Sequence, residues 1–536
     1  METSVQIANP EETNPIFDLD DIVLKLGDLA PPVPEEIGEG LSEKRRAYIK
    51  AIITVARQNS TLLTRDEMAR ILAADFLLQA IEREQQIEGS GVTIPDPETQ
   101  VAMPPGLDEA LKVISKIIEN ANNYQDALRA GVIALQNCIP FVGGIVAAIT
   151  SLLWPQRKKS AWEQVKDQVN RVVHTAIFEN EYKIVQSQIT AVQISLSQYL
   201  NSSNSRERGV ILIATMILTN SLYERVNHSK YRHMLLGLMA PIGLLHLTIL
   251  SERYHHYKEL FGDNERSQAL KELKSTYDQY RQFFDTVFVE WKKWRDEGLK
   301  EFYEVKNILW SKEYRYGVKD ELGQYQFEYR INDKARAADF KKCALNRSVA
   351  DMADILSSTA NYSTFFKGID VALPPILTIL DTIILGPYLG TRFPGTGNEA
   401  HRPVGPWSKD RPEGFVHTIH IYAYNSIDGL QFIYPDMDGT KVTGGGGESF
   451  VLDLKKKHCV GARLGYAKGL VYRLEFVFAD GSTSPLYGNK GGWSPAASVD
   501  ATMGGGYKLH SGNFEKGAGP SQTVGINGVI LTFKRV

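Results

Sequence analysis

The residue types that carry out catalysis occur in this chain without the spacing that catalysis needs. No G-x-S-x-G motif presents a serine nucleophile, and no G-x-x-x-x-G-K-[ST] loop is available to bind phosphate. His417 and His420 are three residues apart on a predicted strand, where their side chains point to opposite faces and cannot coordinate one metal ion together. We therefore expect no enzyme, no cofactor and no metal site.

Cysteine, glycine and charge exclude further classes of protein. Cys138, Cys343 and Cys459 lie far apart without C-x-x-C spacing, which indicates neither a disulfide framework nor a zinc site. The glycine run 444–447 lies between predicted strands, which favours a turn over a phosphate cradle. The net charge of −3 provides no basic field, so nucleic acid is not an expected partner.

Glycine also divides the chain into two parts of different construction. At 536 residues the chain is too long for one ordinary core. Segment 374–536 holds 27 of the 44 glycines, and its short apolar runs alternate with DG, GGGG and NKGG turns, as in an all-β domain. We expect a helical N-terminal region with a linker over 1–105, a helical bundle over 106–360 and a β-domain over 361–536.

Helical periodicity before residue 374 predicts two long amphipathic helices. One begins at Trp162, continues to Ala176 and resumes over 185–196. The other has one continuous apolar stripe, formed by Leu270, Leu273, Tyr277, Tyr280, Phe284, Val287, Trp291 and Trp294. The spacing of these aromatic residues favours core packing over a stacking platform for a ligand.

Three uncharged segments of the bundle are apolar enough to suggest a membrane. They are 131–154, 209–218 and 234–250. The last has 17 residues, or roughly 25 Å of helix against a bilayer core of about 30 Å, so tilt or local thinning is needed. Central helices of a soluble bundle have the same composition. Both interpretations hold together if the bundle opens and exchanges protein contacts for lipid.

Segments 209–218 and 234–250 would form a helical hairpin, because the polar turn near 227–230 joins them. Pro241 and Gly243 are expected to kink its second arm. His246 lies inside that arm, where it is either a neutral core histidine or a pH-sensitive latch. The residues predicted to enter the membrane are Gly209, Ile211, Ile213, Met216, Leu218, Leu235, Leu238, Ile242, Leu245, His246 and Ile249.

Residues 139–173, IPFVGGIVAAITSLLWPQRKKSAWEQVKDQVNRVV, resemble the end of helix one through helix three of the three-domain crystal (Cry) δ-endotoxins. The shared features are Gly143, Gly144, Trp154, Pro155 and Trp162. Segments 205–229, 231–258, 265–300 and 340–356 resemble helices four to seven of that family, in order. The resemblance implies a seven-helix pore-forming bundle whose helix-four and helix-five hairpin enters the membrane.

Residues 374–390 resemble the start of that family's second domain, a three-sheet β-prism of the jacalin type. Jacalin-related lectins have patterns similar to IDGLQFIY (427–434), LVYRLEFVFADG (470–481) and YGNKGGW (487–493). Their GxxxD sugar loop is not matched, because the corresponding stretch 517–528 has no aspartate. We also expect the family's third domain, a β-sandwich, to be lacking. The residues predicted to bind a receptor are Tyr424, Tyr434, Tyr487, Asn489 and Trp493.

Together these patterns predict an insecticidal pore-forming toxin. Its prism would dock on a cell-surface glycan or protein, and its hairpin would enter the target-cell membrane as a self-oligomer. The linker 88–107 contains no Lys or Arg, so activating proteolysis is expected at Arg83 or earlier. No secretory signal is recognisable, which predicts synthesis in the producer's cytoplasm and action outside it. The alternative is a jacalin-type carbohydrate-binding protein with a helical oligomerisation or signalling domain and no pore activity.

Overall fold

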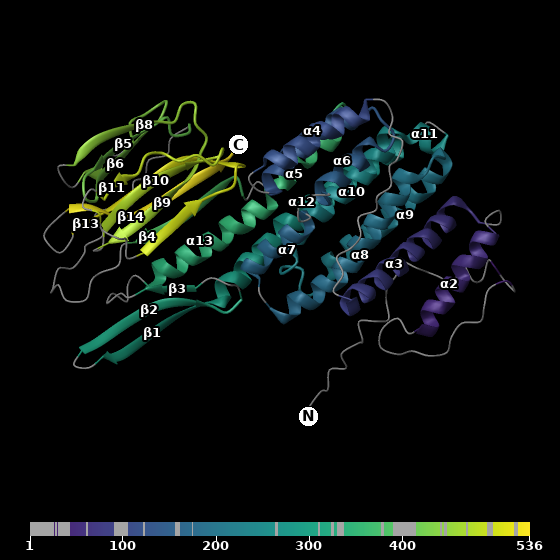
Figure 1. Cartoon of the computed structure of the whole chain (residues 1–536), viewed down its shortest axis with the longest axis horizontal. Coiled ribbons are helices and arrows are strands. Elements are labelled where there is room, and N and C mark those ends of the chain that lie inside the picture. Colours follow the sequence, from purple (N-terminus) through teal and green to yellow (C-terminus); the bar gives the residue numbers. More distant parts are fainter. Residues whose placement is uncertain are drawn as a thin grey trace.

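The chain is an elongated molecule with a helical lobe at one end and a β-sheet lobe at the other, seen here as a computed structural model (Figure 1). The fold class expected from the sequence is confirmed, since a helical bundle is followed by three antiparallel sheets. The structure describes residues 26, 29, 43–59, 63–90, 106–121, 124–155, 161–173, 175–262, 266–308, 311–322, 326–329, 337–376, 380–389, 414–439, 442–443, 447–467, 470–489, 492, 497–518 and 524–536.

The helical lobe begins with an outer pair of helices and continues into the bundle. The outer pair is α2 (Glu43–Gln58) and α3 (Arg65–Ser90). The bundle comprises α4 (Leu107–Asn120), α5 (Tyr124–Ala134), η3 (Leu135–Cys138), α6 (Gly144–Leu153), α7 (Ala161–Val172), α8 (Ala176–Asn201), α9 (Ser205–His228), η4 (Leu236–Leu238), α10 (Met239–His255), α11 (Tyr257–Phe261), α12 (Arg266–Gly298), α13 (Ala337–Leu356) and η6 (Ser357–Phe366).

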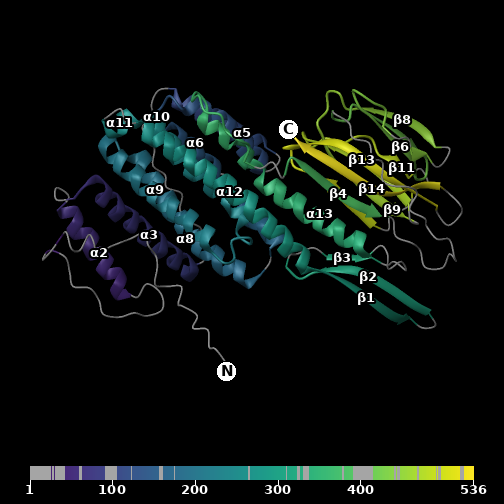
Figure 2. The same cartoon turned by 180° about the vertical axis from the view of Figure 1, so that it is seen from behind.

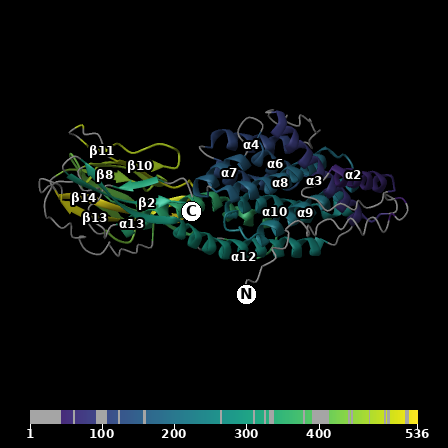
Figure 3. The same cartoon turned by 90° about the horizontal axis from the view of Figure 1, so that it is seen from below.

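Helix α10 lies at the centre of the bundle. Every residue from Met239 to Glu252 is buried. Its neighbours are α6, α9, α12 and η6, and Figure 3 shows α9, α10 and α12 side by side. A helix that is apolar on every side is stable in water only when other elements cover every side. The amphipathic neighbours, such as α12 with its buried aromatic stripe, supply that cover.

Helix α3 contacts α8 and α9 along the outside of the bundle (Figure 2). Its Ala69, Ala73 and Ala80 are fully buried and Phe76 is nearly so, all within the main hydrophobic core. Small side chains let two helices approach closely. Helix α3, which lies in the predicted N-terminal region 1–105, therefore shares the core of the bundle.

The β-lobe is a prism of three antiparallel sheets, which holds most of the remaining core. The sheet orders are β11-β10-β9-β12, β13-β14-β4 and β7-β6-β5-β8. The strands are β4 (Thr382–Leu389), β5 (Thr418–Ala423), β6 (Ile427–Ile433), β7 (Val442–Thr443), β8 (Glu448–Asp453), β9 (Cys459–Ala467), β10 (Leu470–Phe478), β11 (Tyr487–Gly488), β12 (Ala497–Thr502), β13 (Tyr507–Ala518) and β14 (Val524–Arg535). Of the short apolar runs predicted as strands, HTIHIYAY (417–424) contains β5, VYRLEFVF (471–478) lies within β10, and GVILTFKRV (528–536) covers most of β14.

A small antiparallel sheet between α12 and α13 was not predicted. It has the order β1-β2-β3, formed by β1 (Leu299–Ile308), β2 (Ser311–Asp320) and β3 (Gln326–Tyr329). The Arg295 side chain of α12 donates two hydrogen bonds of 2.8 Å to the Asp320 carboxylate on β2, and both side chains are fully buried. This bidentate ion pair fixes the base of the sheet to the bundle.

Backbone polar groups of the prism meet charged side chains of the bundle between the two lobes. Asp354 of α13 accepts a hydrogen bond of 2.9 Å from the Gly504 N–H. Arg129 of α5 donates one of 2.7 Å to the Gly505 carbonyl. A Cβ atom at Gly504 would stand 2.9 Å from Asp354 Oδ1, so glycine allows this approach. Burial raises the pKa of the Asp354 carboxyl to about 7.

Two local predictions in the helical lobe were wrong. The helix expected from Trp162 to Ala176 ends as α7 at Val172, and a separate helix, α8, begins at Ala176 after Thr175, whose hydroxyl accepts a hydrogen bond from the Phe178 N–H. The kink expected at Pro241 does not arise inside a helix, because α10 begins at Met239. Proline is tolerated in a first turn, where its missing N–H would have no partner.

Candidate membrane-insertion hairpin

Helix α9 is the first arm of the predicted hairpin, and its ends are well specified by the sequence. The Asn204 side chain caps it by accepting hydrogen bonds from the N–H groups of Arg206 and Glu207, at 2.9 and 3.4 Å. Glu207 lies in the first turn, while Arg225 and His228 lie in the last turn, as the helix dipole favours. The charges thus gather at both ends and leave an apolar middle.

Among the residues that the structure describes, α9 alone is both long and apolar enough to cross a bilayer. Its 24 residues span roughly 36 Å. The core helix of a soluble protein meets the same criterion, so length and composition do not separate the two interpretations.

The two arms run antiparallel. A Cβ atom at Gly209, near the start of α9, would stand 2.6 Å from the Leu260 carbonyl oxygen in α11, which directly follows α10. The end of α10 therefore lies beside the beginning of α9. The connection after His228 consists of turns and the short helix η4, so Leu235 and Leu238 precede α10.

Ten of the eleven residues predicted to enter the membrane are buried, and one is half-buried. Ile213 is the half-buried residue, on the side of α9 that also carries Val210 and Ile217. The buried ones are Gly209, Ile211, Met216, Leu218, Leu235, Leu238, Ile242, Leu245, His246 and Ile249. The structure thus brings all eleven into the hairpin, and whether they enter a membrane stays a prediction.

His246 is a buried histidine on α10 beside Tyr280 of α12. Its Nδ1 lies 3.4 Å from the Tyr280 hydroxyl, and the two rings meet edge to face. Burial lowers the pKa of His246 to about 4. The imidazole is therefore neutral at pH 7, and α10 carries no charge at this depth. The pH-sensitive latch stays a prediction.

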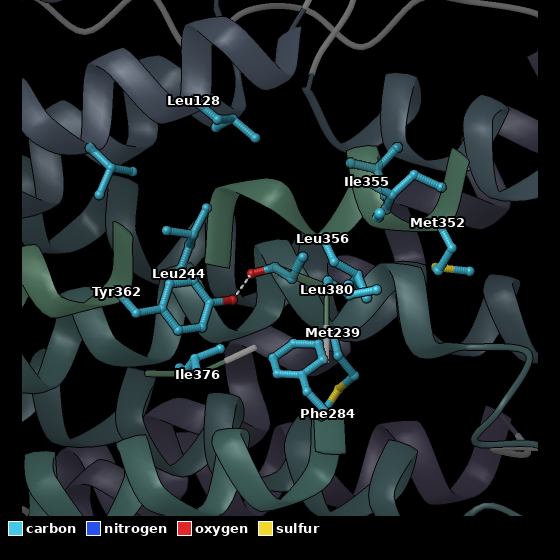
Figure 4. Close-up of a cluster of buried hydrophobic side chains, with 14 of the residues drawn as sticks. Leu128, Met239, Leu244, Phe284, Met352, Ile355, Leu356, Tyr362, Ile376 and Leu380 are labelled. Atoms are coloured by element: carbon cyan, nitrogen blue, oxygen red, sulfur yellow. Dashed lines mark hydrogen bonds between the residues drawn. The ribbon is translucent and has the colours of Figure 1, made fainter. Parts of the chain in front are cut away.

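Tyr362 of η6 holds the first turns of α10 in place (Figure 4). Its hydroxyl donates a hydrogen bond to the Ala240 carbonyl, and its ring is fully buried. The ring passes so close to Gly243 that any side chain there would collide with it. Gly243 thus serves packing between α10 and η6, in place of the predicted kink.

Glu252, near the end of α10, is a buried carboxylate that the sequence analysis missed. Its Oε1 accepts hydrogen bonds from the Gly143 N–H at 2.5 Å and from the Tyr199 hydroxyl at 3.0 Å. Gly143 caps the N-terminus of α6 with φ of 84°, so the carboxylate lies at the positive end of that helix. Burial raises the pKa of Glu252. One side chain therefore ties α10 to α6 and α8.

The hairpin is held to other elements by a few further polar contacts. Ser195 Oγ of α8 and Thr215 Oγ1 of α9 are 2.5 Å apart, and both side chains are fully buried. Near the turn, Arg232 pairs with Glu290 of α12 at 2.9 and 2.5 Å. Apolar contacts make up most of the remaining interface, and lipid can replace apolar contacts.

The prism presents only part of the predicted receptor-binding set. Tyr434 and Tyr487 are each 5% exposed, so the prediction that they contact a receptor was wrong. Both belong to the core, and the Tyr487 ring packs 5.4 Å from that of Phe450. The aromatic residues of the lectin-like pattern fill the prism instead of facing solvent. Trp493 lies outside the described residues.

Tyr424 and Asn489 do come together at one end of the prism. Tyr424 is 51% exposed. The Asn489 N–H donates a hydrogen bond of 3.2 Å to the Asn425 carbonyl, which places the two loops side by side. Asn489 has a φ of 58°, a left-handed conformation that asparagine tolerates better than most residues. These two residues remain the receptor-binding candidates on the described surface.

Arg83, the predicted cleavage residue, lies in the second half of α3, and its side chain is outside those that the structure describes. A protease needs an extended substrate, so cleavage there requires α3 to open locally.

No group of three or more His, Cys, Asp or Glu in the described part of the chain is placed to hold a metal ion.

No protein-family model and no curated protein matches this chain. Among solved structures, PirB is 13% identical, with 73% of this chain and 89% of that chain covered and a TM-score of 0.47. The Bacillus thuringiensis insecticidal crystal protein Cry7Ca1 is 13% identical, with 76% and 75% covered and a TM-score of 0.48. Malaysian banana lectin is 15% identical, with 29% and 99% covered and a TM-score of 0.21.

Proposed function

We propose that this chain is a pore-forming toxin in which α9 and α10 leave the bundle and enter a target-cell membrane. The observation that carries the proposal is the burial of α10, which is apolar on every side and pairs with the bilayer-length helix α9. Between Met239 and Ser251 the only ionisable side chain of α10 is His246, whose pKa burial in the bundle lowers, so the middle of α10 carries little charge into lipid.

Helix α3 is the element that we propose to block this movement before activation. It contacts both α8 and α9, and its Phe76 is 4% exposed within the same core as the hairpin. Withdrawing one such aromatic side chain costs about 2 kcal/mol or more. Proteolytic removal of the N-terminal helices would eliminate that restraint and uncover the half-buried face of α9.

The prism is proposed to dock the toxin on a cell-surface glycan or protein before insertion. Tyr424 offers an exposed aromatic ring and Asn489 a half-buried polar side chain on adjoining loops, a combination that suits recognition. Assembly of several protomers would follow at the membrane, outside the producing cell. Neither catalysis nor a bound cofactor has a part in this mechanism.

Cleavage between residues 91 and 105 is expected to increase dye release from vesicles about tenfold or more, because it frees α3 from the covalent chain. The test inserts a site for a sequence-specific protease into that segment and uses calcein-loaded vesicles made from insect midgut membrane extract. The same variant without protease is the matched control.

Two results would overturn parts of the proposal. Equal release before and after complete cleavage would show that α3 does not restrain the hairpin. No release under any protease treatment, with docking to the vesicles intact, would favour the carbohydrate-binding alternative, in which the helical lobe serves oligomerisation or signalling.

A further inference from the structure

The β1–β2 ribbon is only partly covered by the rest of the described structure. It projects beyond β3 beside the start of α13 (Figures 1 and 2). The two strands pair from Leu299 with Asp320 to Ile308 with Ser311. Strand β3 pairs only with β2 residues 316–319. The outer half of the ribbon is therefore two strands wide, and a bare two-stranded ribbon is marginally stable in water.

Strand β1 is also an edge strand with exposed residues on both faces. Tyr303 is 50% exposed and Val305 is 44% exposed on one face, while Lys300 and Glu304 are exposed on the other. Within the described residues, β2 is the only strand that pairs with β1. Natural proteins usually protect a long edge of this kind, because the outward N–H and C=O groups of an edge strand can pair with another strand.

The charges along β1 complement a reversed copy of the same strand. Antiparallel pairing about a two-fold axis at Phe302 places Lys300 opposite Glu304 of the second copy. By symmetry, Glu304 lies opposite Lys300 of the second copy, so the contact contains this ion pair twice. The same register places Leu299 opposite Val305. Within one chain, Lys300 faces Lys319, so a carboxylate across the free edge would relieve a like-charge pair.

Neighbouring two-fold registers place like charges opposite each other. A shift of the axis to Glu301 sets that carboxylate against its own copy, and a shift to Tyr303 sets Lys300 against Lys306. A two-fold axis midway between two residues would pair odd-numbered with even-numbered positions. Because side chains alternate along a strand, the equivalent faces of the two copies would then lie on opposite sides of the joined sheet. An isologous contact of this kind closes as a dimer.

We propose that β1 binds β1 of a second copy of this chain, antiparallel about Phe302, to form one six-stranded sheet across two protomers. The contact supplies a first step in assembly and to that extent rests on the proposed function. It uses the exposed residues of β1, and it does not involve α9, α10 or the exposed Tyr424.

Charge reversal tests the contact in the full-length chain. Lys300→Glu and Glu304→Lys, each alone, are expected to weaken self-association about tenfold, since each creates two like-charge pairs. The double variant, Lys300→Glu with Glu304→Lys, restores both pairs and should return the association constant to its original value. Sedimentation velocity over a dilution series measures all four proteins. A double variant as weak as the singles would overturn the pairing.

A cysteine at the proposed axis tests the register. Phe302→Cys should form a disulfide-linked dimer under mild oxidation, because each Phe302 faces its own copy. Val305→Cys is the matched control, since its copies would stand roughly 20 Å apart. The three native cysteines are buried and do not compete. Cross-linking through Val305→Cys but not Phe302→Cys would contradict this register.

Dye release is recorded separately on the same variants, so that the two proposals fail independently. If the cross-link and the charge rescue are observed but no variant releases dye, the contact stands and the pore proposal fails. If dye is released with neither cross-link nor charge rescue, the pore proposal stands and this contact is wrong.

Discussion

A disulfide between α8 and α9 is expected to abolish dye release, and a reducing agent is expected to restore it. The double variant Ser195→Cys with Thr215→Cys places the two sulfurs where the hydroxyl oxygens now lie 2.5 Å apart. That separation is close to the length of a disulfide bond, about 2.05 Å, so little backbone movement is needed. Both positions are fully buried, so the bridge would join the helices inside the bundle.

The physical reason is that α9 cannot enter a bilayer while it remains bonded to α8. Each single variant serves as a control, because it carries the same loss of a hydroxyl without the bridge. Binding to vesicles should be unchanged, since α8 and α9 belong to the helical lobe and the prism is the other lobe (Figure 1). Undiminished release from the fully oxidised double variant would mean that α8 and α9 insert together or that other helices form the pore.

Glu252→Ala is expected to lower the free energy of unfolding by about 3 kcal/mol. The substitution leaves the Gly143 N–H and the Tyr199 hydroxyl buried without their acceptor, and it opens a cavity at the end of α10. It also removes the one side chain that ties α10 to both α6 and α8. We therefore expect faster dye release without proteolysis, together with the loss of stability.

Urea unfolding and dye release measure the two effects on the same protein. Glu272→Ala is the matched control, because Glu272 pairs with Arg253, the neighbour of Glu252, at a partly exposed position. Surface ion pairs contribute about 0.5 kcal/mol, so that variant should behave nearly as the original chain does. A Glu252→Ala protein as stable as the Glu272→Ala control would show that Glu252 does not anchor α10.

Periodicity and composition predicted the fold where one physical signal dominates. The aromatic stripe over 270–294 and the apolar segment 209–218 lie within the helices α12 (Arg266–Gly298) and α9 (Ser205–His228). The turn-rich second half matches the three sheets of the prism. In these segments burial and local preference point to the same structure, so the sequence alone is sufficient.

Features that depend on contacts distant in sequence were missed. Glu252 is one carboxylate in an apolar helix, and only its neighbours Gly143 and Tyr199 make it an anchor. Tyr487 belongs to a lectin-like pattern that suggests exposure, yet the adjoining strands bury its ring. Strand β1 alternates charged residues with Tyr303 and Val305, a signal that charge-rich composition obscured. The contact of α3 with α9 has no local signature at all.

The depth of α9 in a bilayer tests the central claim most directly. A small fluorophore on Ile213→Cys would report from the middle of α9, and one on Val113→Cys, an exposed position of α4, would serve as the reference. The vesicles carry lipids with a nitroxide at the centre of the acyl chain. We predict strong quenching at residue 213 and none at residue 113 once dye release begins. Release with residue 213 unquenched would contradict insertion of the hairpin.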